Sequence, residues 1–179
     1  IPRDYYVLLP EYNAYDKLTH AGIYGIETSV SAIENLLDTT INYYVKVNFT
    51  SLIDIVDALG GITIESNYDF TSKDGYHFTK GTNNLDGERA LSFAREREAF
   101  REGDRIRGQN QEIILEALIN KAMSASIITN YADLLNALDD KFLTNITDSE
   151  ITDFIKMQIA NMDTWSIESI SLDGSNAYD

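Results

Sequence analysis

Apolar and polar positions along the chain alternate between the spacing of strands and the spacing of helices. The first nine residues, Ile1–Leu9, are rich in aromatic and branched side chains, which predicts a strand. The polar stretch Pro10–Gly25 has the composition of a loop. A helix is expected next, capped by Thr28, because four apolar residues follow at helical spacing: Val30, Ile33, Leu36 and Leu37.

The middle of the chain repeats this order of strand, helix and strand. Tyr43–Val47 alternates as a strand, and either Asn48 or Thr50 is expected to cap the helix that follows. Gly60-Gly61 would end that helix in a left-handed conformation before a strand over 62–64. The polar stretch 66–84 carries four aromatic residues at two-residue spacing around Asp74-Gly75 and predicts a projecting hairpin: Tyr68, Phe70, Tyr76 and Phe78.

The second half of the chain is predicted to be mainly helical. Four helices and a closing strand are expected, over Leu85–Ala94, Asp104–Ala122, Tyr131–Phe142, Asp148–Met162 and, for the strand, Trp165–Leu172. Strands and helices in this order with short connections indicate a layered α/β domain whose sheet is covered by helices. We expect one domain over 1–172 and a flexible tail over 173–179, because no repeat and no Pro- or Gly-rich linker divides the chain.

Composition narrows the function classes. A chain of 179 residues with 44% hydrophobic residues can bury a substantial core, and its net charge of −15 disfavours binding to nucleic acid or to anionic lipid. The absence of Cys excludes disulfides and a cysteine nucleophile. No run of about 18 apolar residues is present. We expect the chain to begin inside a domain, and any membrane anchor to lie upstream of it.

Arginine is concentrated in one part of this acidic chain. Six of the seven arginines fall within residues 89–107, and the seventh is Arg3; the six are Arg89, Arg95, Arg97, Arg101, Arg105 and Arg107. The guanidinium group presents a rigid fork of donors that matches carboxylate and phosphate oxygens. In an extended Arg95-Glu96-Arg97-Glu98 segment, the arginines would lie on one side and the glutamates on the other.

The helix expected from Asp104 continues this cationic feature. Asp104, Arg107 and Gln111 share one helical face close to the N-terminus, where free N–H groups attract anions. Ile114 and Leu118 follow on the same face, so a ligand with a phosphate head and a hydrocarbon tail would match it. The pattern leaves a structural interpretation open as well: a solvated Arg/Glu face, Asp104 as an N-cap, and Ile114 and Leu118 as core.

Two other features receive no functional assignment. His20 and His77 are too few and too isolated to predict a metal site or a catalytic triad. Gly60-Gly61 matches neither a phosphate-binding loop nor the dinucleotide motif GxGxxG, so we interpret it as a helix stop.

An ordered set of short motifs resembles the LytR-CpsA-Psr family. Its pieces are Ile1-Pro2-Arg3-Asp4, the segments 15–21 (YDKLTHA), 43–49 (YYVKVNF), 56–62 (VDALGGI) and 85–91 (LDGERAL), and the pattern Arg95-x-Arg97…Gly103-Asp104-x-x-Arg107-x-x-x-Gln111. The match is strongest from residue 1 to about 122. It departs from the family at 22–26 (GIYGI), where aromatic residues and a Gly pair are more usual, and the leading strands of the family's domain are missing.

The resemblance implies an α/β/α sandwich with a central mixed β-sheet, held outside the cytoplasmic membrane by an upstream transmembrane helix. It implies a transferase that moves a capsule, teichoic acid or similar glycan from an undecaprenyl-pyrophosphate carrier to peptidoglycan. Arg3, Arg95, Arg97, Arg107 and Gln111 would bind the pyrophosphate, and Asp104 would orient them. The family's Mg²⁺ or Mn²⁺ ion would be held by aspartates that precede Ile1, so no metal ligand is expected in this chain.

Two alternatives remain open at this point. The domain could capture a polyprenyl phosphate or wall glycan without catalysis, or the same arginines could present a lipid-linked pyrophosphate to water for hydrolysis.

Overall fold

A computed structural model of the chain describes residues 1–124, 134, 138, 141–161, 166–168, 170, 172 and 174. The chain divides into two compact units, Ile1–Tyr44 with Glu168–Asp179, and Val45–Ile167. The single domain expected over 1–172 stays a prediction. The tail expected over 173–179 lies outside the described residues apart from Gly174.

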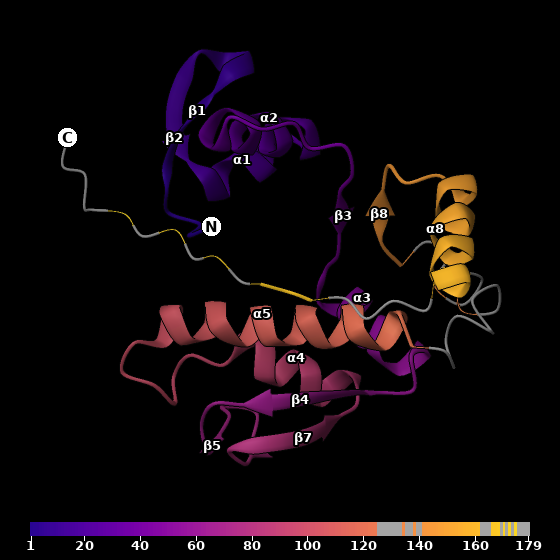
Figure 1. The fold of residues 1–179 in the computed structure, drawn as a ribbon. Helices are drawn as coiled ribbons and strands as arrows, with labels where there is room; N and C mark the ends of the chain where they lie inside the picture. Colours follow the sequence, from indigo (N-terminus) through magenta and orange to yellow (C-terminus); the bar gives the residue numbers. More distant parts are fainter. Residues whose placement is uncertain are drawn as a thin grey trace. The chain divides into compact units, whose positions relative to one another are not determined.

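The first unit is a small hairpin packed on two helices (Figure 1). Its elements are β1 (Tyr6–Leu9), the 3-10 turn η1 (Pro10–Tyr12), β2 (Ala14–Lys17), α1 (Leu18–Tyr24) and α2 (Ile26–Leu37). β1 and β2 are antiparallel, with Tyr6 opposite Lys17 and Leu9 opposite Ala14. Alternate residues of β1 face inward because side chains alternate along a strand, and they form a core with two small helical residues: Val7, Leu9, Ala21 and Ala32.

Two predictions for this unit were wrong. The segment 10–25 is not a loop, because most of it forms regular structure: the 3-10 turn η1, the strand β2 and the helix α1. Thr28 does not cap α2; the helix begins at Ile26 after Gly25, and Thr28 is buried within its first turn. A Gly with φ +129 starts the helix by changing the chain direction rather than by supplying a side-chain acceptor.

The strands of the second unit are short and pair in antiparallel fashion. β4 (Ile62–Ser66) pairs with β7 (Gly81–Leu85), from Ile62 opposite Leu85 to Ser66 opposite Gly81. β5 (Phe70–Thr71) pairs with β6 (His77–Phe78) to form the predicted hairpin, and β3 (Val45–Lys46) pairs with β8 (Leu143–Thr144). Phe70 and Phe78 are buried, so one face of the hairpin lies against the core.

The helices of the second unit follow the predicted periodicity closely. They are α3 (Phe49–Ala58), α4 (Gly87–Arg95), α5 (Gly103–Ala122) and α8 (Asp148–Asn161). Asn48, and not Thr50, caps α3, since its side chain accepts a hydrogen bond from Ser51 N at 2.9 Å. Gly60 and Gly61 both have positive φ, which confirms the left-handed helix stop.

One apolar core joins α3, α4 and α5 to the β4–β7 ladder (Figure 1). Its buried members are Val56, Ile62, Ile64, Phe70, Phe78, Leu85, Ala90, Phe93, Ala94, Ile114 and Ala117. Aromatic rings in this core contact one another, and Phe78 and Phe93 meet edge to face at 5.2 Å between ring centroids. Burial of these side chains is the main stabilisation of the frame that carries the arginines.

The α/β class is confirmed, since helices and strands alternate and pack together in both units. Among the described residues the strands form four two-stranded antiparallel sheets, where one central mixed sheet was expected. The helix expected over 131–142 lies almost entirely outside the described residues, and those described within 165–172 carry no strand. No helix in the described ranges combines the length and apolar character that crossing a membrane requires.

Candidate functional site

The arginine loop is defined here as Arg95, the last residue of α4, together with the residues 96–102 that lead to α5. Asp86 caps α4 at its other end by accepting a hydrogen bond from Arg89 N at 2.9 Å. At Glu96 the backbone leaves the helix and becomes extended, with φ −64 and ψ 131. The extended backbone predicted for the whole segment is found at Glu96, but Arg95 is the last residue of α4 and Glu98 lies in a turn. Arg95 and Arg97 are exposed while Glu96 is buried.

The two glutamates of the segment face the turn of the β5–β6 hairpin. Glu96 Oε2 accepts a hydrogen bond from Lys73 N at 2.6 Å, and Glu98 Oε1 pairs with Lys73 Nζ at 2.6 Å. Both carboxylates thus meet one residue of the hairpin turn. The two glutamates were predicted to lie on one side of the segment, and their shared contact with Lys73 agrees with this.

The arginines of the loop have different surroundings from the glutamates. The guanidinium group of Arg95 lies over the ring of Phe49, 4.5 Å from its centroid, at the start of α3. Within the described residues, neither Arg95 nor Arg97 forms an ion pair with a carboxylate. Their positive charges are therefore available to an external anion.

The backbone of the arginine loop packs against the start of α5. A side chain at Gly103 would overlap the carbonyl oxygen of Arg97, so the loop backbone lies directly on the first turn of the helix. The buried amide of Asn110 donates a hydrogen bond from Nδ2 to Phe93 O at 3.0 Å and fastens α5 to the end of α4. Arg97 is consequently held beside a helix N-terminus, where unpaired N–H groups and the helix dipole favour anions.

Asp104 and Arg107 form an ion pair within the first turns of α5. Arg107 Nη2 lies 3.0 Å from Asp104 Oδ1, and the Arg107 side chain is only 22% exposed. Asp104 is a helical residue after Glu102, which occupies the N-cap position, so the alternative of Asp104 as an N-cap was wrong. Gln111 is exposed one turn later on the same helix.

The apolar residues on this helix serve the core. Ile114 is a buried member of the main cluster, and Leu118 packs against that cluster. This matches the structural interpretation of the pair. Their part in lining a lipid pocket stays a prediction.

Arg3 belongs to the first unit, where two of the sequence motifs meet. Arg3 Nε lies 3.5 Å from Asp4 Oδ2, and Thr19 N donates to Arg3 O at 2.8 Å. A hydrogen bond from Lys17 lowers the pKa of the Asp4 carboxyl, and so, more weakly, do the charges of Lys17 and Arg3. This network holds the backbone of Arg3 at the start of α1, and its place in a pyrophosphate site stays a prediction.

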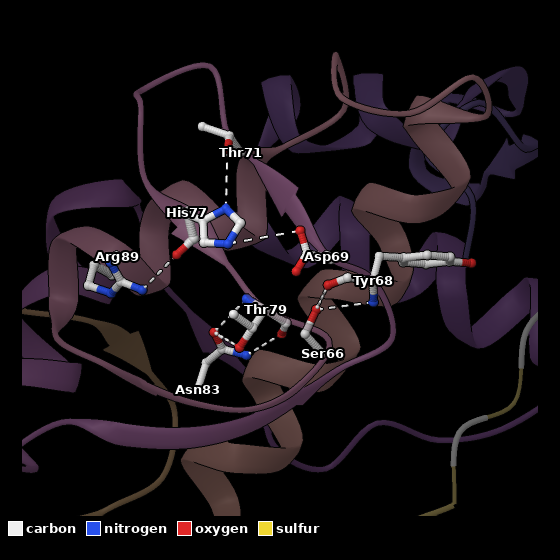
Figure 2. Close-up of polar contacts among 8 residues, drawn as sticks. All are labelled: Ser66, Tyr68, Asp69, Thr71, His77, Thr79, Asn83 and Arg89. Carbon is white, nitrogen blue, oxygen red and sulfur yellow. Dashed lines mark hydrogen bonds and ion pairs between the residues drawn. The ribbon is translucent and has the colours of Figure 1, made fainter.

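Arg89 and the two histidines have structural contacts. Arg89 Nη2 donates to His77 O at 3.1 Å (Figure 2), and its guanidinium group lies 5.0 Å from the centroid of the Phe78 ring. The His77 ring lies between Thr71 Oγ1, at 3.3 Å, and Asp69 Oδ1, at 3.9 Å (Figure 2). These contacts stabilise the β5–β6 hairpin. His20 Nδ1 lies 2.8 Å from Asp16 Oδ1, and this hydrogen bond lowers the pKa of Asp16.

The residues that the structure describes contain no group of three or more His, Cys, Asp or Glu side chains placed to hold a metal ion. The resemblance places the ligands of its Mg²⁺ or Mn²⁺ ion before Ile1, so this ion stays a prediction.

Two contributors to the site were not identified from the sequence. Glu96 was expected only to lie opposite the arginines, and Phe49 was treated as part of a motif. Alternation of Arg and Glu was the available signal for Glu96, but its burial depends on Lys73, which is 23 residues earlier. No local pattern marks Phe49 as a stacking partner for Arg95.

Comparison with known proteins decides the family. The profile of the LytR_cpsA_psr family matches residues 1–179. The chain belongs to the LytR-CpsA-Psr family. This confirms the resemblance that the ordered motifs indicated.

Individual LytR-CpsA-Psr relatives agree with this assignment. A protein of Bacillus anthracis named polyisoprenyl-teichoic acid–peptidoglycan teichoic acid transferase TagU is 39% identical over 157 residues, which are 87% of this chain and 52% of that protein. The crystal structure of TagV of B. subtilis matches with a TM-score of 0.77 and 31% identity, over 90% of this chain and 64% of that chain. A structure described as TagT bound to LIIa-WTA matches with a TM-score of 0.71 and 34% identity, over 87% of this chain and 60% of that one. The chain spans about half the length of the curated relatives it matches.

Proposed function

We propose that this LytR-CpsA-Psr chain is part of a transferase that moves a cell-wall glycopolymer from a polyprenyl-pyrophosphate carrier to peptidoglycan. The observation that carries the proposal is the arginine loop, where two exposed arginines have no carboxylate partner in the described part of the chain and Arg97 lies against the start of α5. An acidic chain of net charge −15 that leaves such cations uncompensated is suited to bind a small, highly charged anion. The name of the TagU relative, a teichoic acid transferase, supports the same reaction.

The predicted polar site residues of the second unit each have a part in this proposal. Arg95 and Arg97 hold the pyrophosphate oxygens, together with Arg107 and Gln111. Asp104 acts on Arg107, because their ion pair at 3.0 Å holds the guanidinium group at the first turns of α5. A guanidinium group has five N–H donors, so Arg107 can keep Asp104 and still donate to a phosphate.

The reaction that fits this arrangement is phosphoryl transfer. A hydroxyl oxygen of peptidoglycan attacks the phosphorus that carries the glycan, the bond from that phosphorus to polyprenyl phosphate breaks, and the hydroxyl proton passes to solvent. Negative charge grows on the leaving phosphate, and fixed guanidinium groups stabilise it without reorganising. The chain's own contribution is thus to position the pyrophosphate and to stabilise its charge.

Location and metal belong to the same proposal. Peptidoglycan and teichoic acid, which appear in the name of the TagU relative, are wall polymers, so we place the active domain outside the cytoplasmic membrane, tethered to it by a transmembrane helix. We propose that Mg²⁺ or Mn²⁺, when bound, neutralises charge on the pyrophosphate through ligands other than the described residues.

The experiment compares the purified protein with the double variant Arg95→Ala/Arg97→Ala, using a polyprenyl-pyrophosphate-linked glycan and peptidoglycan as substrates. We expect the variant to fold and to lose at least roughly a hundredfold of transfer rate, as removal of charge-stabilising donors does elsewhere. Product analysis separates the alternatives. A new glycan–peptidoglycan linkage supports transfer, release of phosphorylated glycan to water would indicate hydrolysis, and binding without products would indicate an accessory role. Wild-type transfer by the double variant would reject the proposal.

A further inference from the structure

The turn of the β5–β6 hairpin is fastened to α4 and to the arginine loop by polar contacts. Ser92 Oγ lies 2.9 Å from Ser72 Oγ and 3.0 Å from Asp74 Oδ2, and both serines are buried. Lys73 follows Ser72 and contacts the loop through its backbone N–H as well as its side chain. The turn is therefore joined to the segment that bears the arginines, and not only to the core beneath it.

The Glu96 carboxylate is the centre of this attachment. It is 4% exposed, and its two oxygens accept hydrogen bonds from different segments: Oε2 from Lys73 N at 2.6 Å, and Oε1 from Ala99 N at 2.9 Å. Burial by itself raises the pKa of Glu96, but the backbone N–H groups of Ala99, Lys73, Glu98 and Arg97 outweigh it and lower the pKa below its usual value. The group is thus a buried anion that the backbone holds in its charged form.

Glu96 lies between Arg95 and Arg97 in the sequence, so its hydrogen bonds also restrict these two arginines. Glu96 is the extended residue between Arg95, which ends α4, and Arg97, so a Glu96 side chain fixed on the hairpin turn restricts the backbone that carries both arginines. Two further contacts complete the constraint. Phe49 lies beneath the guanidinium group of Arg95, and Gly103 lies against the carbonyl of Arg97.

Glu98 offers an internal comparison, since it also reaches Lys73. Its contact is an ion pair with the flexible end of the lysine, and both side chains are more than half exposed. Pairs of this kind contribute about 0–1 kcal/mol because water screens them and side-chain entropy opposes them. Glu98 consequently does little to fix the backbone, whereas Glu96 binds two backbone N–H groups directly.

We propose that Glu96 is a positioning residue of the anion site: its carboxylate, held by N–H groups of the hairpin turn and of the arginine loop, fixes Arg95 and Arg97 in the orientation that binds pyrophosphate. This inference deepens the proposed function and depends on it. Glu96 itself does not touch the ligand. It acts through the backbone of the loop, so its loss should weaken anion binding in protein that remains folded.

The test uses farnesyl pyrophosphate as a short polyprenyl-pyrophosphate probe, titrated calorimetrically into the purified protein well below the Tm of each variant. Glu96→Gln keeps the size of the side chain but turns an N–H₂ group toward one of the two backbone donors. We expect its Kd to rise about tenfold, which corresponds to about 1.4 kcal/mol. The matched control Glu98→Gln should stay within about twofold of the wild type.

A spectroscopic readout separates positioning from a general loss of structure. In NMR spectra, the Nε–Hε groups of Arg95 and Arg97 should become more mobile in Glu96→Gln, while that of Arg107 keeps its wild-type signal. If Glu96→Gln does not fold, Glu96→Asp takes its place. It keeps the charge but is one methylene too short to reach both donors, and it should raise Kd severalfold with the same pattern of mobility.

The outcomes distinguish this inference from the proposed function. A folded Glu96 variant with wild-type Kd and rigid loop arginines overturns the inference, even if Arg95→Ala/Arg97→Ala abolishes binding. If the double arginine variant also binds the probe like the wild type, the proposed function fails and the inference fails with it. Weaker binding in both, with Glu98→Gln unaffected, supports both.

Discussion

The arginine loop and the first turns of α5 carry the same kind of side chain in opposite electrostatic settings. At the start of α5, each of two arginines pairs with an acid three residues earlier: Arg105 with Glu102, the N-cap residue, at 3.2 Å and Arg107 with Asp104 at 3.0 Å. In the loop, the neighbouring glutamates are turned toward Lys73, so within the described residues Arg95 and Arg97 have no carboxylate partner. The comparison teaches that the sequence alone does not decide whether an interleaved acid neutralises an arginine; the direction of its side chain does.

The difference predicts how much each arginine contributes to binding. An anion that binds Arg97 displaces only water from the guanidinium group. An anion that binds Arg107 must share the N–H donors of that guanidinium group with Asp104. The Arg105 side chain is 74% exposed and already paired with Glu102, so it should add little to anion binding beyond its share of the protein's net charge. The contribution should therefore fall in the order Arg97, Arg107, Arg105.

The largest expected effect comes from single substitutions that test this order. Arg97→Ala should lower the transfer rate roughly a hundredfold, because it removes an uncompensated donor that stabilises developing charge. Arg107→Ala should lower it about tenfold, and Arg105→Ala should leave it within about twofold. Initial rates at saturating peptidoglycan provide the measurement, with circular dichroism as the check on folding. Equal losses for Arg97→Ala and Arg105→Ala would show that the cations act only through net charge.

A smaller effect is expected from changing the contact that joins the two regions. In Gly103→Ala the new methyl group would overlap the carbonyl oxygen of Arg97, so the loop must move away from α5. We expect a loss of about 1–3 kcal/mol in the free energy of unfolding, the usual result of overpacking, together with weaker binding of farnesyl pyrophosphate.

Gly108 on the same helix is the matched control for that substitution. No atom lies within 4 Å of a Cβ built there, so Gly108→Ala meets open space. Alanine is the better helix former, and the variant should gain up to about 1 kcal/mol in stability while binding like the wild type. Urea denaturation of both variants measures the pair. A stable Gly103→Ala protein with unchanged binding would show that the loop does not depend on this contact.

The sequence predicted the parts of this site that depend on local spacing, and missed those that depend on distant partners. The extended backbone at Glu96 and the helix that ends at Ala122 follow from side-chain alternation and from apolar periodicity, both of which act over a few residues. The burial of Glu96 was missed because it depends on the hairpin turn. Thr28 was assigned as a cap because its residue type favours that position, but packing placed it inside α2.

Acid should weaken the attachment of the arginine loop, because it protonates the Glu96 carboxylate while the arginines keep their charge. The pKa of Glu96 is lower in the folded chain than its ordinary value of 4.5, so its stabilising contribution is fully present above about pH 4.5. It is lost as the pH falls below that value through the folded-state pKa. The difference in free energy of unfolding between the wild type and Glu96→Gln should therefore shrink as the pH falls below about 4.5.

Urea denaturation at several pH values measures this difference. Asp4 and Asp16 also have lowered pKa values, but both proteins contain them and their contributions cancel. Gly108→Ala serves as the control, because its offset from the wild type involves no titratable group and should not change with pH. A Glu96→Gln offset that is equally constant would mean that the carboxylate is not held in its charged form by the fold.

The smallest expected effect concerns the ring beneath Arg95. Phe49 is 59% exposed, so its contact with the guanidinium group is a surface cation–π interaction, worth about 0.5–1 kcal/mol. Phe49→Leu keeps an apolar side chain but loses the π face, and it should weaken binding of farnesyl pyrophosphate about two- to fivefold. Phe49→Tyr keeps the ring and should bind like the wild type. Because Arg97 has no such ring in the described part of the chain, Phe49→Leu should have no effect in an Arg95→Ala background but its full effect in an Arg97→Ala background. Equal effects in the two backgrounds would mean that Phe49 supports the whole loop and not the orientation of one arginine.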